Sequence, residues 1–367
     1  MIPKIRRADS DRSRPRSAFS RTGAARPLEV WLDPRALSDA GVGLFVGFAG
    51  HEFVSVYSTA DVPGVQRVET VAHGESDTAG VKWVDGSTTS MQRGGLLGAA
   101  QRRASRVGAD RNVDPGSLLE TAILADVART RRADAFVSDA VGLTVAAIGA
   151  NGMLVGEVLS LIGLFMRNLD EYFVPGEQTV RYDRSAFWWL MSRELLPSWG
   201  PTWRELGDRA DGGRHPHTNG LGFAPLQRVG HALRARDRVH VELQGQPKGG
   251  SAEEAAHAFD VLVLCLDAGF DACARVLNSH LDIGKDEAAR WRGKGFRQKV
   301  ASKLPALEPL LAAGGQVKDA LRLLGALRRT LHGAPAQPVG YDNRADERDS
   351  TRIVVTMDTI TEIEPVV

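Results

Sequence analysis

The chain has 367 residues, a length that predicts two domains at about 150 residues each. With 43% hydrophobic and 25% charged residues, the composition is typical of a globular protein and excludes a chain too polar to build cores. The net charge of +1 excludes a protein that is basic overall, so any contact with nucleic acid must come from local clusters.

Residues 1–27 form a basic arm. The arm holds eight lysines and arginines against two aspartates, and few large apolar residues. This composition predicts disorder, and the arm contains no apolar run like that of a secretory signal. It favours a solvated tail that contacts RNA or DNA through charge.

Strand and helix patterns alternate after the arm. Leu28–Asp33 is an apolar run that ends in an aspartate, weaker strand patterns cover 65–71 and 81–84, and a helix with a basic face is expected at 92–107. The alternation predicts an α/β layer with a parallel sheet.

A second helix and a further strand follow along the chain. Asp114-Pro-Gly-Ser117 has the capping residue and early proline that start a helix, which is expected to end near Arg131-Arg132. The apolar strand 134–139 follows and, like the first strand, ends in an aspartate, Asp139.

Three acidic residues in this layer are candidates for chemistry: Asp33, Glu120 and Asp139. The functional crevice of an open α/β sheet lies beyond the carboxyl ends of its strands, and Glu120 opens the helix before the second strand. Carboxylates gathered there bind hard cations, which can assist phosphoryl displacement. The alternative is that the two aspartates only form turns or caps.

The segment from Leu119-Glu120 to Ser138-Asp139, with the earlier Trp31-Leu32-Asp33, resembles PIN-domain ribonucleases over residues 28–140. That resemblance implies hydrolysis of RNA phosphodiesters with magnesium or manganese. It also implies that Asp33, Glu120 and Asp139 are the metal ligands and catalytic residues.

The middle of the chain contains an apolar stretch, Val141–Met166. Its 26 residues could span a bilayer, but Glu157 and several glycines favour a buried turn and a core helix, so we expect no membrane span. A helix is expected at 153–172 and another from Phe187, and the Gly-rich segment 207–220 is expected to be a linker.

The C-terminal region favours three helices, at 252–282, 285–304 and 315–332, and a late strand at 352–357. Cys265 and Cys273 lie in the first of them, eight residues apart. Two cysteines exclude a disulfide framework and favour reduced core thiols in a cytoplasmic protein. Basic residues of the second helix, among them Arg290, Arg292 and Arg297, form a patch that either contacts phosphates or is only a solvated face.

The last helix ends in Leu327-Arg-Arg-Thr-Leu-His-Gly333. Arg328 and His332 are four residues apart and share one helix face. An arginine that holds a phosphate beside a titrating histidine could cleave RNA without metal, with His332 acting on the ribose 2′-hydroxyl. The alternative is that Arg328 and Arg329 form a solvated face and His332 caps the helix.

This motif, after three helices, resembles HEPN-domain ribonucleases over roughly residues 250–333. The resemblance implies an active site that contains Arg328 and His332 and forms across a homodimer of the C-terminal helices. It also implies RNA as the partner.

We therefore predict an α/β domain at 28–172, a helical connector and linker at 173–220, and a mainly α-helical domain at 221–367. The predicted function is RNA binding and cleavage, and the two resemblances associate it with toxin or phage-defence systems. The competing interpretations are a non-catalytic nucleic-acid-binding or assembly protein with degenerate sites, and a protein-binding scaffold.

Overall fold

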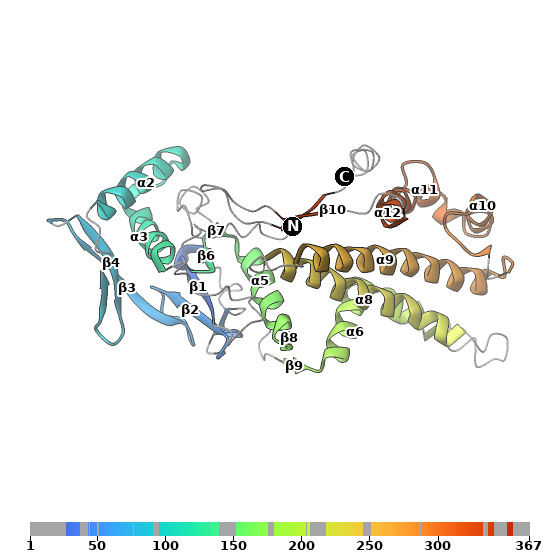
Figure 1. Cartoon of the computed structure of the whole chain (residues 1–367), viewed down its shortest axis with the longest axis horizontal. Coiled ribbons are helices and arrows are strands. Elements are labelled where there is room, and N and C mark those ends of the chain that lie inside the picture. The colour runs from blue at the N-terminus through green and yellow to red at the C-terminus, as the bar shows by residue number, and fades with distance from the viewer. Residues whose placement is uncertain are drawn as a thin grey trace. The chain divides into compact units, whose positions relative to one another are not determined.

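The structure is a computed structural model, and contacts between residues divide it after Tyr182 into two compact units (Figure 1). Each unit is described by itself. The residues that the structure describes are 27–36, 43, 45–49, 51–75, 77–90, 95–131, 133–138, 152–174, 180–202, 204–205, 218–244, 251–285, 288–332, 337–340 and 351–354. The basic arm up to residue 26 and most of the predicted linker lie outside these ranges, and the predicted domain boundaries stay predictions.

The first unit is built on a mixed, mostly parallel sheet, which confirms the predicted fold class. Its strand order is β5-β4-β3-β2-β1-β6-β7. The strands from β3 to β7 in this order pair in parallel, whereas β3, β4 and β5 form an antiparallel meander. The bounds are β1 (Leu28–Leu32), β2 (Val54–Ser58), β3 (Gln66–His73), β4 (Thr78–Trp83), β5 (Thr88–Ser90), β6 (Ala135–Val137) and β7 (Gly152–Met153).

Strand β1 lies inside the sheet because nearly all of its side chains are apolar. Leu28, Val30, Trp31 and Leu32 are fully buried, as expected for a strand covered on both faces. Trp31 is in register with Tyr57 of β2 and Phe136 of β6, so three aromatic rings share one face. The Trp31 and Tyr57 rings stack, with their centroids 5.0 Å apart.

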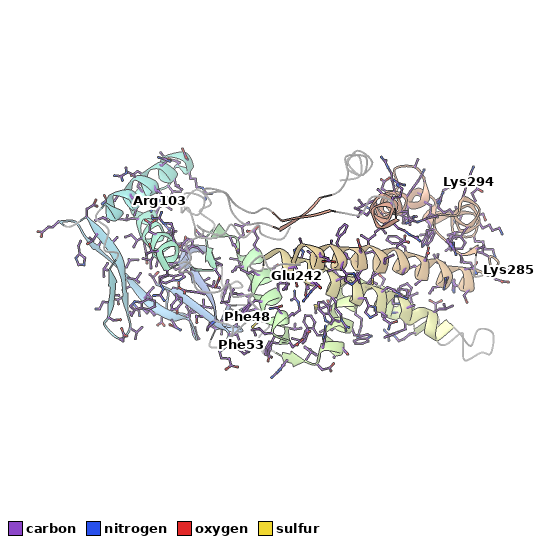
Figure 2. All side chains as sticks on the ribbon, in the orientation of Figure 1. Phe48, Phe53, Arg103, Glu242, Lys285 and Lys294 are labelled. Atoms are coloured by element: carbon purple, nitrogen blue, oxygen red, sulfur yellow. The ribbon has the colours of Figure 1, made fainter. Side chains whose placement is uncertain are left out.

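Two helices cover this aromatic face: α2 (Leu96–Arg111) and α3 (Pro115–Arg131). They pack against each other and against the sheet, and their buried residues form one cluster with Trp31, Val81 and Phe136. Asp126 is buried in α3, where desolvation raises its pKa. Arg103 of α2, labelled in Figure 2, forms an ion pair with the Asp126 carboxylate.

The first unit ends with helix α5 (Val155–Asn168) and a hairpin of β8 (Tyr172–Val174) and β9 (Val180–Tyr182). Glu157 lies in the first turn of α5, where its carboxylate accepts a hydrogen bond from the backbone N–H of Leu154 at 2.9 Å. Glu157, whose charge disfavours a membrane span, therefore caps the helix. Within the described ranges, no helix combines the length and apolar character that crossing a bilayer requires.

The second unit is mainly helical, as predicted. Helices α6 (Arg184–Leu195), α8 (Thr218–Gln244) and α9 (Ser251–Leu281) come first along the chain. Arg228 of α8 lies beside Gly269 of α9, and Arg238 pairs with Glu254 at 3.3 Å. Because residue numbers rise along α8 as they fall along α9, the two helices are antiparallel.

Three further helices pack with α9. They are α10 (Lys294–Lys303), α11 (Glu308–Leu311) and α12 (Gln316–His332), and a short 3-10 helix (Pro305–Leu307) connects the first two. Trp291, Phe296, Val300 and Leu321 are buried in a core that also includes Ala274 of α9. The hairpin of β10 (Gln337–Gly340) and β11 (Thr351–Val354) also contacts α9.

The sequence prediction was wrong at two places in this unit. Helix α8 was not predicted, because Pro225 and an arginine-rich stretch interrupt its apolar pattern. The predicted helix at 285–304 begins only at Lys294, since Trp291 is buried in a turn before it. Both cysteines of α9 are unpaired, as predicted. Burial raises the pKa of the Cys273 thiol to about 11, which disfavours its thiolate form.

We predict that Phe136→Ala lowers the free energy of unfolding of the first unit by about 3–5 kcal/mol, because it leaves a cavity beneath α3. Urea denaturation followed by circular dichroism measures this change. Val84→Ala, at a side chain that is 81% exposed, is the control and should change it by less than about 0.5 kcal/mol. Equal effects of the two variants would contradict the assignment of Phe136 to the core.

Candidate functional site

The carboxyl ends of β1 and β6 form the candidate site of the first unit. From β1 the chain continues to β2 and β3 on one side, and later to β6 and β7 on the other. The direction in which successive strands are added to the sheet therefore reverses between β1 and β6. In open α/β sheets, ligands bind at the carboxyl ends of the strands at such a switch point. Asp33 directly follows β1, and Ser138 directly follows β6.

Asp33 is held rigidly at this point. Its side chain is fully buried, and Ser138 Oγ donates a hydrogen bond to its Oδ2 at 2.8 Å. The Asp33 backbone N–H donates to the Val137 carbonyl at 2.8 Å, which continues the β1–β6 pairing. Ser58, the last residue of β2, donates from its hydroxyl to the Leu32 carbonyl at 3.2 Å. Two serine hydroxyls thus connect the ends of three neighbouring strands.

Arg35 neutralises the Asp33 carboxylate. It lies in a 3-10 turn, Pro34–Ala36, and its backbone N–H and Nε donate to Asp33 Oδ1 at 3.1 and 3.3 Å. Its terminal nitrogens donate to the Ser117 carbonyl and to Thr121 Oγ1, both on α3. Arg35 therefore ties the end of β1 to the first turns of α3.

The structure places two of the predicted acidic residues on adjoining elements, Asp33 at the end of β1 and Glu120 on α3. Glu120 precedes Thr121 on α3, so it lies on the helix that Arg35 contacts, and its side chain is exposed. Asp139 lies outside the described residues, although Ser138 before it contacts Asp33. Sequence reasoning missed Ser138 and Arg35, for which the only signal was their position next to strand-terminal aspartates.

The Asp33 carboxylate and the Ser138 hydroxyl are oxygen groups of the kind that a hard divalent cation accepts as ligands. Within the described part of the chain, however, no three acidic, histidine or cysteine side chains converge on one point. A cation at Asp33 would also compete with the Arg35 guanidinium. The ligand set implied by the sequence is therefore complete only with Asp139 and Glu120.

The second unit brings two predicted arginines together around one carboxylate. Asp267 of α9 accepts from Arg328 Nη1 at 2.7 Å through Oδ2 and from Arg292 Nη2 at 2.5 Å through Oδ1. The Asp267 side chain is 10% exposed, whereas those of Arg292 and Arg328 are 39% and 41% exposed. Sequence reasoning missed Asp267, although an aspartate inside an apolar helix face is itself a signal for a cationic partner.

The other predicted basic residues lie near this cluster in the sequence. Arg290 and Arg329 are exposed, and Arg297 Nη1 donates to the Trp291 carbonyl at 2.5 Å. His332 is the last residue of α12, as predicted, but its side chain lies outside the described residues. The predicted Arg328–His332 pair is therefore placed on one helix, and its side-chain geometry stays a prediction.

Comparisons with protein-family models, with curated proteins and with solved structures gave no match. The fold and site define a class instead: an α/β unit with a buried, arginine-paired aspartate at the switch point of its sheet, followed by a helical unit with an exposed arginine pair.

We predict that Arg35→Gln lowers the free energy of unfolding by about 1–3 kcal/mol, because the buried Asp33 carboxylate loses its cation and a hydrogen-bond donor. Asp33→Asn in the same chain should recover part of the loss, since the two residues interact directly. Urea denaturation of both single variants and the double variant measures the coupling. Strictly additive effects would show that the pair contributes nothing.

Proposed function

We propose that the protein is an RNA-binding ribonuclease. The observation that carries the proposal is the direct contact between Asp33 and Ser138, at the adjacent ends of two parallel strands. This contact supports a convergence of Asp33 and Asp139, which follow neighbouring strands but are more than one hundred positions apart in the sequence. Polar groups at such a strand edge are placed to receive a phosphate ester.

In this proposal the first unit is PIN-like and hydrolyses RNA phosphodiesters. Asp33, Glu120 and Asp139 would hold magnesium or manganese, which when bound supplies Lewis-acid chemistry to the phosphoryl group. Ser138 fixes the Asp33 carboxylate through Oδ2 and so limits its rotation. The Arg35 guanidinium, which is partly exposed at the same strand end, would attract the phosphate.

The second unit is HEPN-like in this proposal and binds the RNA backbone. Five arginines would contact phosphates: Arg290, Arg292, Arg297, Arg328 and Arg329. The exposure of Arg292 and Arg328 supports this role. Homodimerisation through the C-terminal helices would place two such surfaces in one assembly and could complete a metal-independent site with His332.

A second candidate function is non-catalytic binding or assembly on nucleic acid. It is favoured by the Arg35–Asp33 pair, because both Asp33 oxygens already have partners without a metal ion. Under it, RNA affinity is sensitive to salt and no cleavage occurs. The unpaired thiols of α9 support a reducing, cytoplasmic setting for either function, and a toxin or phage-defence role follows from the two family resemblances alone.

We predict that the purified protein cleaves single-stranded RNA with manganese and not with EDTA. Asp33→Asn and Asp139→Asn should abolish cleavage, since each removes a carboxylate ligand. Ser138→Ala should weaken manganese affinity by about tenfold to a hundredfold, as loss of a group that orients a metal ligand does, and calorimetry with manganese measures this without RNA. Unchanged manganese affinity in Ser138→Ala would contradict the metal site at Asp33.

We predict that any cleavage that persists in EDTA depends on the end of α12. His332→Ala should remove it while leaving RNA affinity within about twofold, because the histidine would transfer protons and the arginines would bind. Gel-based cleavage and fluorescence anisotropy measure the two effects. Residual cleavage that His332→Ala does not change would exclude the HEPN-like mechanism.

A further inference from the structure

The Asp267 cluster connects three separate segments of the second unit. Asp267 lies on α9, Arg292 in the turn between α9 and α10, and Arg328 on α12. Because one carboxylate accepts from both guanidinium groups, through different oxygens, it fixes the distance between them.

The turn that carries Arg292 is itself anchored. Trp291, the preceding residue, is buried and packs edge-to-face on Phe296, with the ring centroids 5.4 Å apart. Arg297 donates to the Trp291 carbonyl, which secures the turn from the other side. Arg292 Nη1 also lies near Gly325 of α12, at 3.7 Å from the position that a Cβ on this glycine would take. The anchored turn therefore places Arg292 beside α12, where its charge pairs with Asp267.

The charge of the cluster suits a phosphodiester. Two guanidinium groups and one carboxylate leave one positive charge, which matches the single negative charge of an RNA phosphodiester. Arg275 and Arg290 add two positive charges beside it and Asp271 adds one negative charge, so the surroundings of the cluster are also positive; burial and the Asp267 charge raise the pKa of Asp271.

The donors of the cluster also suit this ligand. A guanidinium has five N–H donors in a planar fork. Asp267 engages one terminal nitrogen of each arginine, and about two fifths of each arginine side chain is exposed. Two guanidinium groups at a fixed spacing can donate bidentate hydrogen bonds to the two free oxygens of one phosphate, or to adjacent phosphates.

We propose that Asp267 is a positioning residue that holds Arg292 and Arg328 as a preformed fork for the RNA phosphate backbone. This inference rests on the proposed RNA binding. It assigns to a buried acid a role opposite to that expected from its charge: Asp267 repels RNA at long range, yet it strengthens binding by ordering the two arginines before the ligand arrives.

Asp267→Asn separates these two effects. The substitution removes the negative charge of Asp267 and so raises the net charge of the cluster by one. Electrostatic attraction alone then predicts tighter RNA binding and a steeper dependence on salt. Positioning predicts the reverse: affinity about five- to tenfold weaker, and a salt slope smaller by about one. Fluorescence anisotropy of the full chain with a labelled single-stranded RNA, titrated at several salt concentrations, measures both. Asp267→Glu keeps the carboxylate and should recover much of the affinity.

Two variants test the fork if Asp267→Asn fails to fold. Arg292→Lys and Arg328→Lys keep the charge but lose the planar donors, so each should weaken binding about three- to tenfold. Arg322→Lys, at an exposed position of the same helix α12, is the matched control and should leave affinity unchanged.

The outcomes separate the two proposals. If the wild-type chain binds no RNA, the proposed function fails and the fork fails with it. If the wild-type chain binds RNA but Asp267→Asn binds equally or more tightly, RNA binding stands and the positioning role is overturned. If the lysine variants bind like Arg322→Lys, the arginines act only as charges and the fork is overturned as well.

Discussion

The pairing of β1 with β6 is the interaction on which the account of the first unit depends. It places Leu32 opposite Val137, and so Asp33 beside Ser138, although the two strands are separated by about one hundred residues of other structure. The aromatic contacts beneath α3 stabilise this pairing from one face. The strand pairing and the packing of this core therefore determine where Asp33 lies.

Arginine–carboxylate pairs recur where an acid is buried in either unit. Arg35 compensates Asp33, Arg103 compensates Asp126, and two arginines compensate Asp267. A buried carboxylate is costly unless it is paired and hydrogen-bonded. The pairs differ in exposure: Arg103 is largely covered, whereas Arg35, Arg292 and Arg328 remain partly open to solvent. In the open pairs, part of each guanidinium group stays accessible while the carboxylate keeps its partner.

The sequence was sufficient for the fold class and for the ends of β1, α3 and α12, because apolar periodicity and capping residues are local signals. It could not show that Asp33 touches Ser138 or that Asp267 joins two arginines, because these contacts depend on pairing and packing between distant segments. Helix α8 was not predicted for a local reason: Pro225 and the charged residues of the helix interrupt its apolar pattern.

The most direct test of the central claim is a crystal structure of the protein grown with manganese, with anomalous scattering used to locate the ion. The account predicts an anomalous peak between the carboxylates of Asp33 and Asp139, with the Arg35 guanidinium displaced from Asp33. An unchanged Arg35–Asp33 pair with no peak at this sheet edge would contradict a metal-dependent nuclease site. It would leave the arginine pair of the helical unit as the remaining basis for a role with RNA.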